Sequence, residues 1–161
     1  MKTRLTIIIT TLLFAFAAFG NVQAEVNKSD FDVAENIIEA VKNIDIVSLN
    51  VLLAEGATVD TVDEAGNTPL MLAAKIGNPR MLDIILRHNP KINERNNDGN
   101  TALMISSEMG VVEISRTLIK HGADLSMKNS DGLSPVQIAL RHGHRDIAKL
   151  MRSEQEMPVS R

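Results

Sequence analysis

The sequence predicts an all-α repeat solenoid built from stacked helix-turn-helix units. The first observation is a fixed period, because Gly66, Gly99 and Gly132 follow one another at intervals of 33 residues. The second is that each period contains two short apolar segments with helical spacing, separated by another glycine. A period of this length is typical of stacked-repeat proteins. Helices this short are not stable alone, and one pair cannot bury its apolar face, so the units must stack.

The N-terminus has the features of a secretory signal peptide. Two basic residues precede the uncharged, mostly apolar run of residues 5–20, and Val22-Gln23-Ala24 supplies small residues at the −3 and −1 positions of a cleavage site. We expect residues 1–24 to be removed on export and residues 25–29 to form a leader, with an uncleaved signal anchor as the alternative. The chain has no cysteine, so repeat stacking and not disulfides must hold the exported fold together.

The first repeat, residues 30–62, is degenerate but keeps the apolar positions of the period. Val33 replaces its turn glycine, and Glu39 and Lys42 place charge on one side of its first helix. A terminal repeat needs a polar outer face, so this unit is predicted to be an N-terminal cap. Its second helix is predicted over residues 46–54.

The second repeat, residues 63–95, has the clearest local signals. Thr68 is predicted to cap a helix that begins at Pro69, where a missing N–H costs nothing, and Gly77 lies where a left-handed residue would end it. Asn78-Pro79 repeats the cap and proline at the start of a second amphipathic helix. Each unit is therefore two antiparallel helices and a turn.

Two further repeats follow at the same spacing. Residues 96–128 form the third, and residues 129–153 form a fourth whose last helix is polar on its far side, which suits a C-terminal cap. Residues 154–161 have no periodicity and are predicted to form a disordered tail.

The segment from Gly66 to Gly77 identifies a family resemblance. Its sequence, G-N-T-P-L-M-L-A-A-x-x-G, is similar to the ankyrin pattern G-x-T-P-L-H-x-A-A-x-x-G. The resemblance covers residues 30–153 and implies ankyrin repeats joined by β-hairpin-like turns. The chain departs from the pattern at the histidine, which the family uses to tie adjacent repeats together. The residues there are Met71, Met104 and Gln137, so thioether packing is expected instead.

Composition argues against nucleic acid as a partner. The formal charge is −3 and only 2% of the residues are aromatic, whereas single-strand binders need a basic groove and aromatic platforms.

No constellation of residues indicates catalysis or metal binding. His88 and His121 lie one period apart at a position where the family commonly has histidine, and His142 and His144 lack the spacing of a helical zinc pair. Ser106 and Ser107 replace small alanines, and no nucleophile elbow surrounds them. The turn carboxylates have a sufficient explanation as turn formers. We therefore expect no enzyme activity, no catalytic residue, no metal and no cofactor.

The resemblance implies that hairpin tips and the open ends of the first helices form a concave binding face. The residues that match these positions, which vary in the family, are Glu64, Ala65, Asn67, Lys75, Ile76, Asn97, Asp98, Asn100, Glu108, Met109, Ser130, Asp131, Leu133, Arg141 and His142. Ile76, Met109 and His142 form one row across three repeats. The two apolar members are either a contact patch or side chains tucked under the next loop.

The expected function is that of an exported, bacterial, periplasmic module that binds another protein. By resemblance to exported ankyrin proteins, the partner is expected to be an envelope or secreted enzyme that is held, inhibited or protected. We expect a monomer that has no membrane segment after signal cleavage. The alternatives are a secreted effector that binds a host protein and a hydrolase with an unrecognised site.

Overall fold

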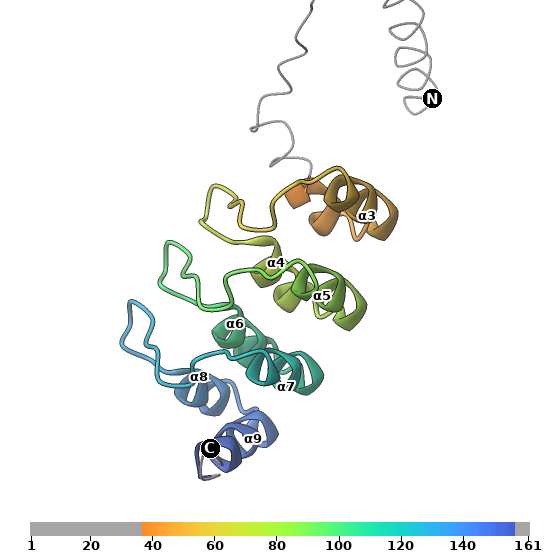
Figure 1. Ribbon diagram of the computed structural model, residues 1–161. Coiled ribbons are helices and arrows are strands. Elements are labelled where there is room, and N and C mark those ends of the chain that lie inside the picture. The colour runs from red at the N-terminus through yellow and green to blue at the C-terminus, as the bar shows by residue number, and fades with distance from the viewer. Residues whose placement is uncertain (1–36, 157–161) are drawn as a thin grey trace, which may run out of the picture.

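The computed structural model describes residues 37–156, which form a stack of antiparallel helix pairs (Figure 1). The helical residues 37–42 pair with α3, and three further pairs follow along the chain. The helices are α3 (Ile46–Ala54), α4 (Pro69–Ile76), α5 (Pro79–Leu86), α6 (Ala102–Met109), α7 (Val112–Lys120), α8 (Pro135–Arg141) and α9 (Arg145–Glu156). No strand occurs among the described residues. The all-α repeat solenoid predicted from the sequence is thereby confirmed.

The helix ends follow the local signals in the sequence. The backbone N–H of Met71 donates to the Thr68 side chain at 3.3 Å, Pro69 is the first residue of α4, and Gly77 ends it with a φ of 75°. Asn78 accepts from the N–H of Met81 and caps α5 in the same way. Because these signals are local, the sequence suffices to place the helices.

The core runs through the stack between the first and second helices of the pairs. Leu70 and Leu103 are each 1% exposed and occupy equivalent positions, whereas their equivalent Val136 in the last pair is only partly buried. Met71 and Met104 are also 1% exposed, in agreement with the predicted thioether packing. Gln137 differs, because its side chain and that of Ser134 form a reciprocal capping box at the start of α8.

The serines of α6 are buried packing residues, as the sequence predicts. Ser106 donates to the backbone oxygen of Leu103 at 2.9 Å, and Ser107 donates to the same oxygen at 2.6 Å. Ser106 also lies 2.9 Å from the hydroxyl of the fully buried Ser115 on α7, a pairing that the sequence analysis missed. These buried hydroxyls therefore have partners.

Three features differ from the sequence analysis or lie beyond its reach. Helix α9 extends to Glu156, so the prediction of a disordered tail is wrong for residues 154–156. These residues are good helix formers, and they continue a helix whose preceding turn is held by the buried Leu150 and Met151. Ile44 has a φ of 56°, which is unusual for a β-branched residue. The predictions for residues 1–36, including the signal peptide, leader and first turn, and for residues 157–161 lie outside the described residues.

Candidate functional site

The loops between helix pairs project from the stack as hairpin-like turns (Figure 1). They share one hydrogen-bond pattern. In the middle loop, Asn96 Oδ1 accepts from the backbone N–H of Asp98 at 3.1 Å and of Asn100 at 2.8 Å. The glycine between them, Gly99, has a φ of 75°. An asparagine that accepts from its own turn and a glycine with positive φ are the residues this geometry favours. Asp63 and Asn129 accept equivalent N–H groups in the flanking loops, so the three tips have one shape.

Side-chain amides tie each loop to the next. Asn96 Nδ2 donates to Asn67 Oδ1 at 2.9 Å, and one repeat later Asn129 Nδ2 donates to Asn100 Oδ1 at 3.0 Å. These two bonds form an asparagine ladder along the stack. Asn67 and Asn100, which the sequence analysis assigned to partner binding, therefore use their side-chain oxygens inside the protein.

Asn97 has a similar internal role. Its backbone N–H donates to the oxygen of Ala65 at 3.0 Å, and its Nδ2 donates to the backbone oxygen of Glu64 at 3.0 Å. A Cβ on Gly66 would meet Asn97 Oδ1 at 2.6 Å, so glycine is required there by close approach as well as by backbone conformation. Glu64 and Ala65 are exposed at the tip and leave their side chains available.

The asparagine ladder has a different residue at each end. Asp63 takes the place of Asn96 at the N-terminal end, and its Oδ2 lies 3.6 Å from Lys42 Nζ. Burial opposes ionisation of this carboxyl, but hydrogen bonds from Asn67 and Ala65 together with the Lys42 charge hold its pKa below the ordinary value. At the other end Leu133 replaces Asn67 and offers no amide acceptor.

A groove, named the concave groove below, lies between the turns of residues 96–100 and 129–133 and helices α6 and α8. It has a volume of about 410 Å³. Eight residues that the sequence assigned to partner binding line it, namely Asp98, Asn100, Glu108, Ser130, Asp131, Leu133, Arg141 and His142. Asn129 and Ile138 also line the groove and were missed, although Asn129 stands one period after Asn96 and so had a sequence signal. The other seven assigned residues do not line this groove.

The row of Ile76, Met109 and His142 is not uniform. Ile76 is partly buried and packs against the core, so its side chain is not an exposed contact patch. Met109 is 41% exposed and His142 is exposed. Lys75, beside Ile76, is also exposed. The row therefore contains one exposed apolar side chain, Met109.

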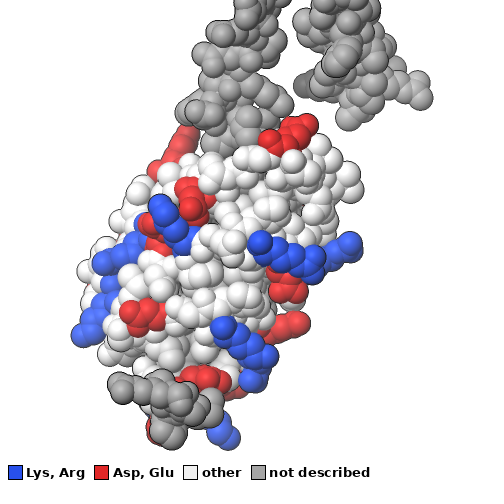
Figure 2. All heavy atoms as spheres, viewed as in Figure 1, with Lys and Arg blue, Asp and Glu red and all other residues white. Residues whose placement is uncertain are grey.

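Charge on the surface is mixed. Figure 2 shows Lys and Arg side chains interspersed with Asp and Glu on the visible face. The groove itself carries three carboxylates, Asp98, Glu108 and Asp131, against the one guanidinium of Arg141. Its electrostatic preference is therefore for a cationic group.

The histidines serve local structure or face solvent. His144 Nε2 lies 3.0 Å from the backbone oxygen of Glu108, and His121 Nδ1 lies 2.8 Å from that of Thr117. Within residues 37–156 no three His, Cys, Asp or Glu side chains come close enough together to hold a metal ion. In the same range no helix is long and apolar enough to cross a membrane.

Two family comparisons match the chain. The family described as Ankyrin repeats (3 copies) matches residues 37–129, and the family described as Ankyrin repeats (many copies) matches residues 107–152. No curated protein matches the chain.

Proposed function

Because the chain belongs to the ankyrin-repeat family, whose repeats form protein-protein interaction modules, we propose that it is a non-catalytic binding protein of the cell envelope. Its concave groove receives a segment of one partner protein. The activity is occupancy of a partner surface, and the partner is an envelope enzyme that the module inhibits or protects.

The concave groove is the observation that carries this proposal. Eight of the residues assigned to binding line this groove, which has a volume of about 410 Å³. The loops that form its rim are fixed by the asparagine ladder and by bonds within each turn. A rim held in one shape before binding loses little conformational freedom when the partner arrives, which favours affinity.

The chemistry of the groove favours a basic segment of the partner. Asp98 and Asp131 are exposed at successive tips, and Glu108 is half-buried on α6 between them. A lysine or arginine side chain placed among these carboxylates would be attracted at long range and then held by charge-assisted hydrogen bonds. Met109, next to Glu108, adds an exposed apolar surface for the stem of such a side chain.

The location rests on the sequence of residues 1–24. The charged start, apolar run and Val22-Gln23-Ala24 site support export and cleavage. Intact-mass analysis of the exported protein should place its new N-terminus at Glu25. A full-length, membrane-retained species would contradict cleavage and support the signal-anchor alternative.

Affinity capture with matched variants tests the function. Wild-type protein is immobilised and exposed to an envelope extract, and retained proteins are identified by mass spectrometry. We expect that the Asp98→Lys plus Asp131→Lys variant no longer retains one protein that the wild type retains. The control variant, Arg87→Glu plus Arg116→Glu, should still retain it. Both arginines are exposed and lie at the second helices of their pairs, α5 and α7. Loss with the arginine pair alone would place binding on the opposite side. Retention only from a host-cell extract would favour the secreted-effector alternative.

A further inference from the structure

Among the described residues, the first helix pair has no preceding repeat on the end face where its equivalents have one. Leu72, Ile105 and Ile138 are 6–8% exposed because the preceding repeat packs on them, whereas their equivalent Glu39 is exposed. Val51 is 51% exposed, whereas its equivalent Leu150 in α9 is 9% exposed. The positions that contact the preceding repeat elsewhere in the stack are thus exposed to solvent at the N-terminal end of the described residues. Such a contact between two neighbouring repeats is called a joint below.

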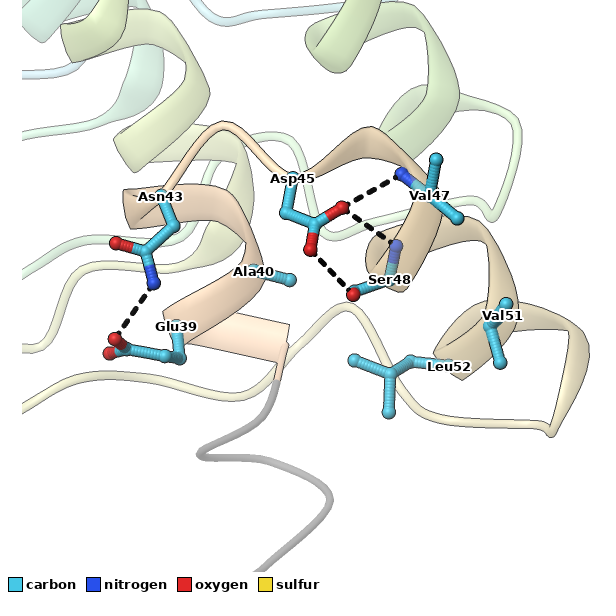
Figure 3. A pocket seen from close by; sticks show the side chains of 8 residues that line it. All are labelled: Glu39, Ala40, Asn43, Asp45, Val47, Ser48, Val51 and Leu52. Carbon is cyan, nitrogen blue, oxygen red and sulfur yellow. Dashed lines mark hydrogen bonds between the residues drawn. The ribbon is translucent and has the colours of Figure 1, made fainter. Parts of the chain in front are cut away.

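This end face contains a groove of about 370 Å³ between the helical residues 37–42 and α3 (Figure 3). Ala40, Val51 and Leu52 supply apolar walls, and Glu39 and Asp45 supply negative charge. Figure 3 shows the Asp45 carboxylate bonded to the N–H groups of Val47 and Ser48 and to the Ser48 hydroxyl. Hydrogen bonds from Ser48 hold the pKa of Asp45 below its ordinary value, so the charge persists in mild acid.

The opposite end of the stack has the complementary character. Leu140 of α8 is 43% exposed, whereas its equivalents Ala74 and Ser107 are fully buried under the next repeat. The next residue, Arg141, is exposed, and so is Arg152 of α9. The C-terminal end face therefore combines one apolar side chain with positive charge, and the N-terminal end face combines an apolar groove with negative charge.

We propose that the N-terminal end face of one copy binds the C-terminal end face of a second copy, so that the solenoid continues from chain to chain. The repeat geometry supplies the fit, because each end face is one half of the joint used inside the stack. The charges supply the preference for opposite ends over like ends. This inference is independent of the proposed partner.

The internal joint between the last two repeats predicts the contact. His144 lies over Gly110 and reaches the backbone oxygen of Glu108. Advancing this contact by one repeat places Asp45 of the next copy over Gly143, beside Arg141. Space for it exists, since no atom lies within 4 Å of a Cβ built on Gly143. The Asp45 carboxylate cannot donate to the backbone oxygen of Arg141 as an imidazole N–H can to that of Glu108, so its attraction would be to the Arg141 guanidinium.

Several features keep this association weak and reversible. Glu39 and Ser48 stand where internal repeats have fully or nearly buried apolar residues, so the joint buries less apolar surface than an internal one. Leu133 cannot continue the asparagine ladder to another loop. The contact is also heterologous, so it forms open chains and not closed dimers. At low concentration we therefore expect the monomer that the sequence predicts.

Sedimentation of the intact protein over a wide concentration range tests the proposal. At low salt we expect the average mass to rise beyond that of a dimer, and high salt should reverse the rise. Glu39→Lys and Arg141→Glu should each weaken association about tenfold or more, because each places like charges at the joint. Mixing these two variants should restore association, since the reversed faces complement each other. Lys120→Glu, at the exposed end of α7, is the matched control and should change nothing.

Three outcomes would overturn it. The first is a wild-type protein that stays monomeric at low salt and high concentration. The second is weakening by Glu39→Lys but not by Arg141→Glu, which would indicate association of two N-terminal end faces. The third is failure of the mixture to associate although both variants keep the wild-type urea midpoint and therefore remain folded.

Discussion

His144 Nε2 lies 3.0 Å from the backbone oxygen of Glu108, and the His144 ring covers Gly110 of the preceding repeat. This one side chain spans the joint between α6 and α9. A side chain at residue 110 would therefore collide with the imidazole that covers this glycine.

Gly110→Ala should destabilise the protein more than Gly143→Ala. Both glycines have positive φ, so alanine costs roughly 1–2 kcal/mol of backbone strain at either site. At Gly110 the new Cβ also collides with the His144 ring, and losing the bond to Glu108 adds roughly 1 kcal/mol. Urea unfolding of the two variants measures the difference. Equal midpoints would mean that the ring moves aside without cost.

Leu103→Ala should cost about 2–5 kcal/mol, because it removes a large side chain that is 1% exposed at the centre of the stack. Val136→Ala is the matched control, since Val136 occupies the equivalent position but is only partly buried. We expect a clearly smaller loss of unfolding free energy for the control. The same loss at both positions would contradict the packing of the last repeat.

Asp63→Asn should remove an acid-sensitive contribution to stability. The lowered pKa of Asp63 means that its contribution is present above the unfolded pKa and is lost as pH falls through the folded pKa. Asparagine keeps the turn acceptor, as Asn96 and Asn129 show, but cannot pair with Lys42. The variant should therefore be less stable at neutral pH, and the difference should shrink below pH ~4. Urea midpoints across this pH range provide the measurement, and a constant difference would contradict the ionic contribution.

Once a partner is known, charge in the concave groove should control its association rate. Asp131→Lys reverses a carboxylate at an exposed tip and should slow association about tenfold at low salt, with a smaller change in dissociation. Raising the ionic strength should lower the association rate of the wild-type protein towards that of the variant. Asp83→Lys, exposed on α5, is the control and should leave the rate unchanged. Rates insensitive to both salt and Asp131→Lys would exclude a basic partner surface.

Local signals in the sequence predicted the helices well. Thr68, Pro69 and Gly77 each act within one turn of chain, so their roles can be read without knowing what packs on them. Ile44 shows the opposite case. Its left-handed backbone takes the place of Gly77 and its equivalents, and a β-branched side chain gives no local reason to expect that conformation.

The sequence located the hairpin tips and the helix ends, but not the hydrogen bonds that their side chains make inside the protein. The period located the tips and the helix ends, and three residues assigned to binding on that basis, Asp98, Asp131 and Arg141, line one groove. The period does not say whether a polar side chain at a tip faces solvent or the next loop. Asn100 was therefore assigned to binding although its oxygen accepts from Asn129. Both residues recur at the period, so pairing them was possible in principle.

The cross-repeat hydrogen bonds have a consequence for how fast the protein folds. Those made by side chains in the described residues join positions that are 29 to 36 apart in sequence, with Asn67 and Asn96 at the near limit and Glu108 and His144 at the far limit. No such bond links the two ends of the array, so loop closure is short at every step. Folding should therefore begin in the central repeats, where both neighbours are present, and spread outwards on a millisecond or faster timescale.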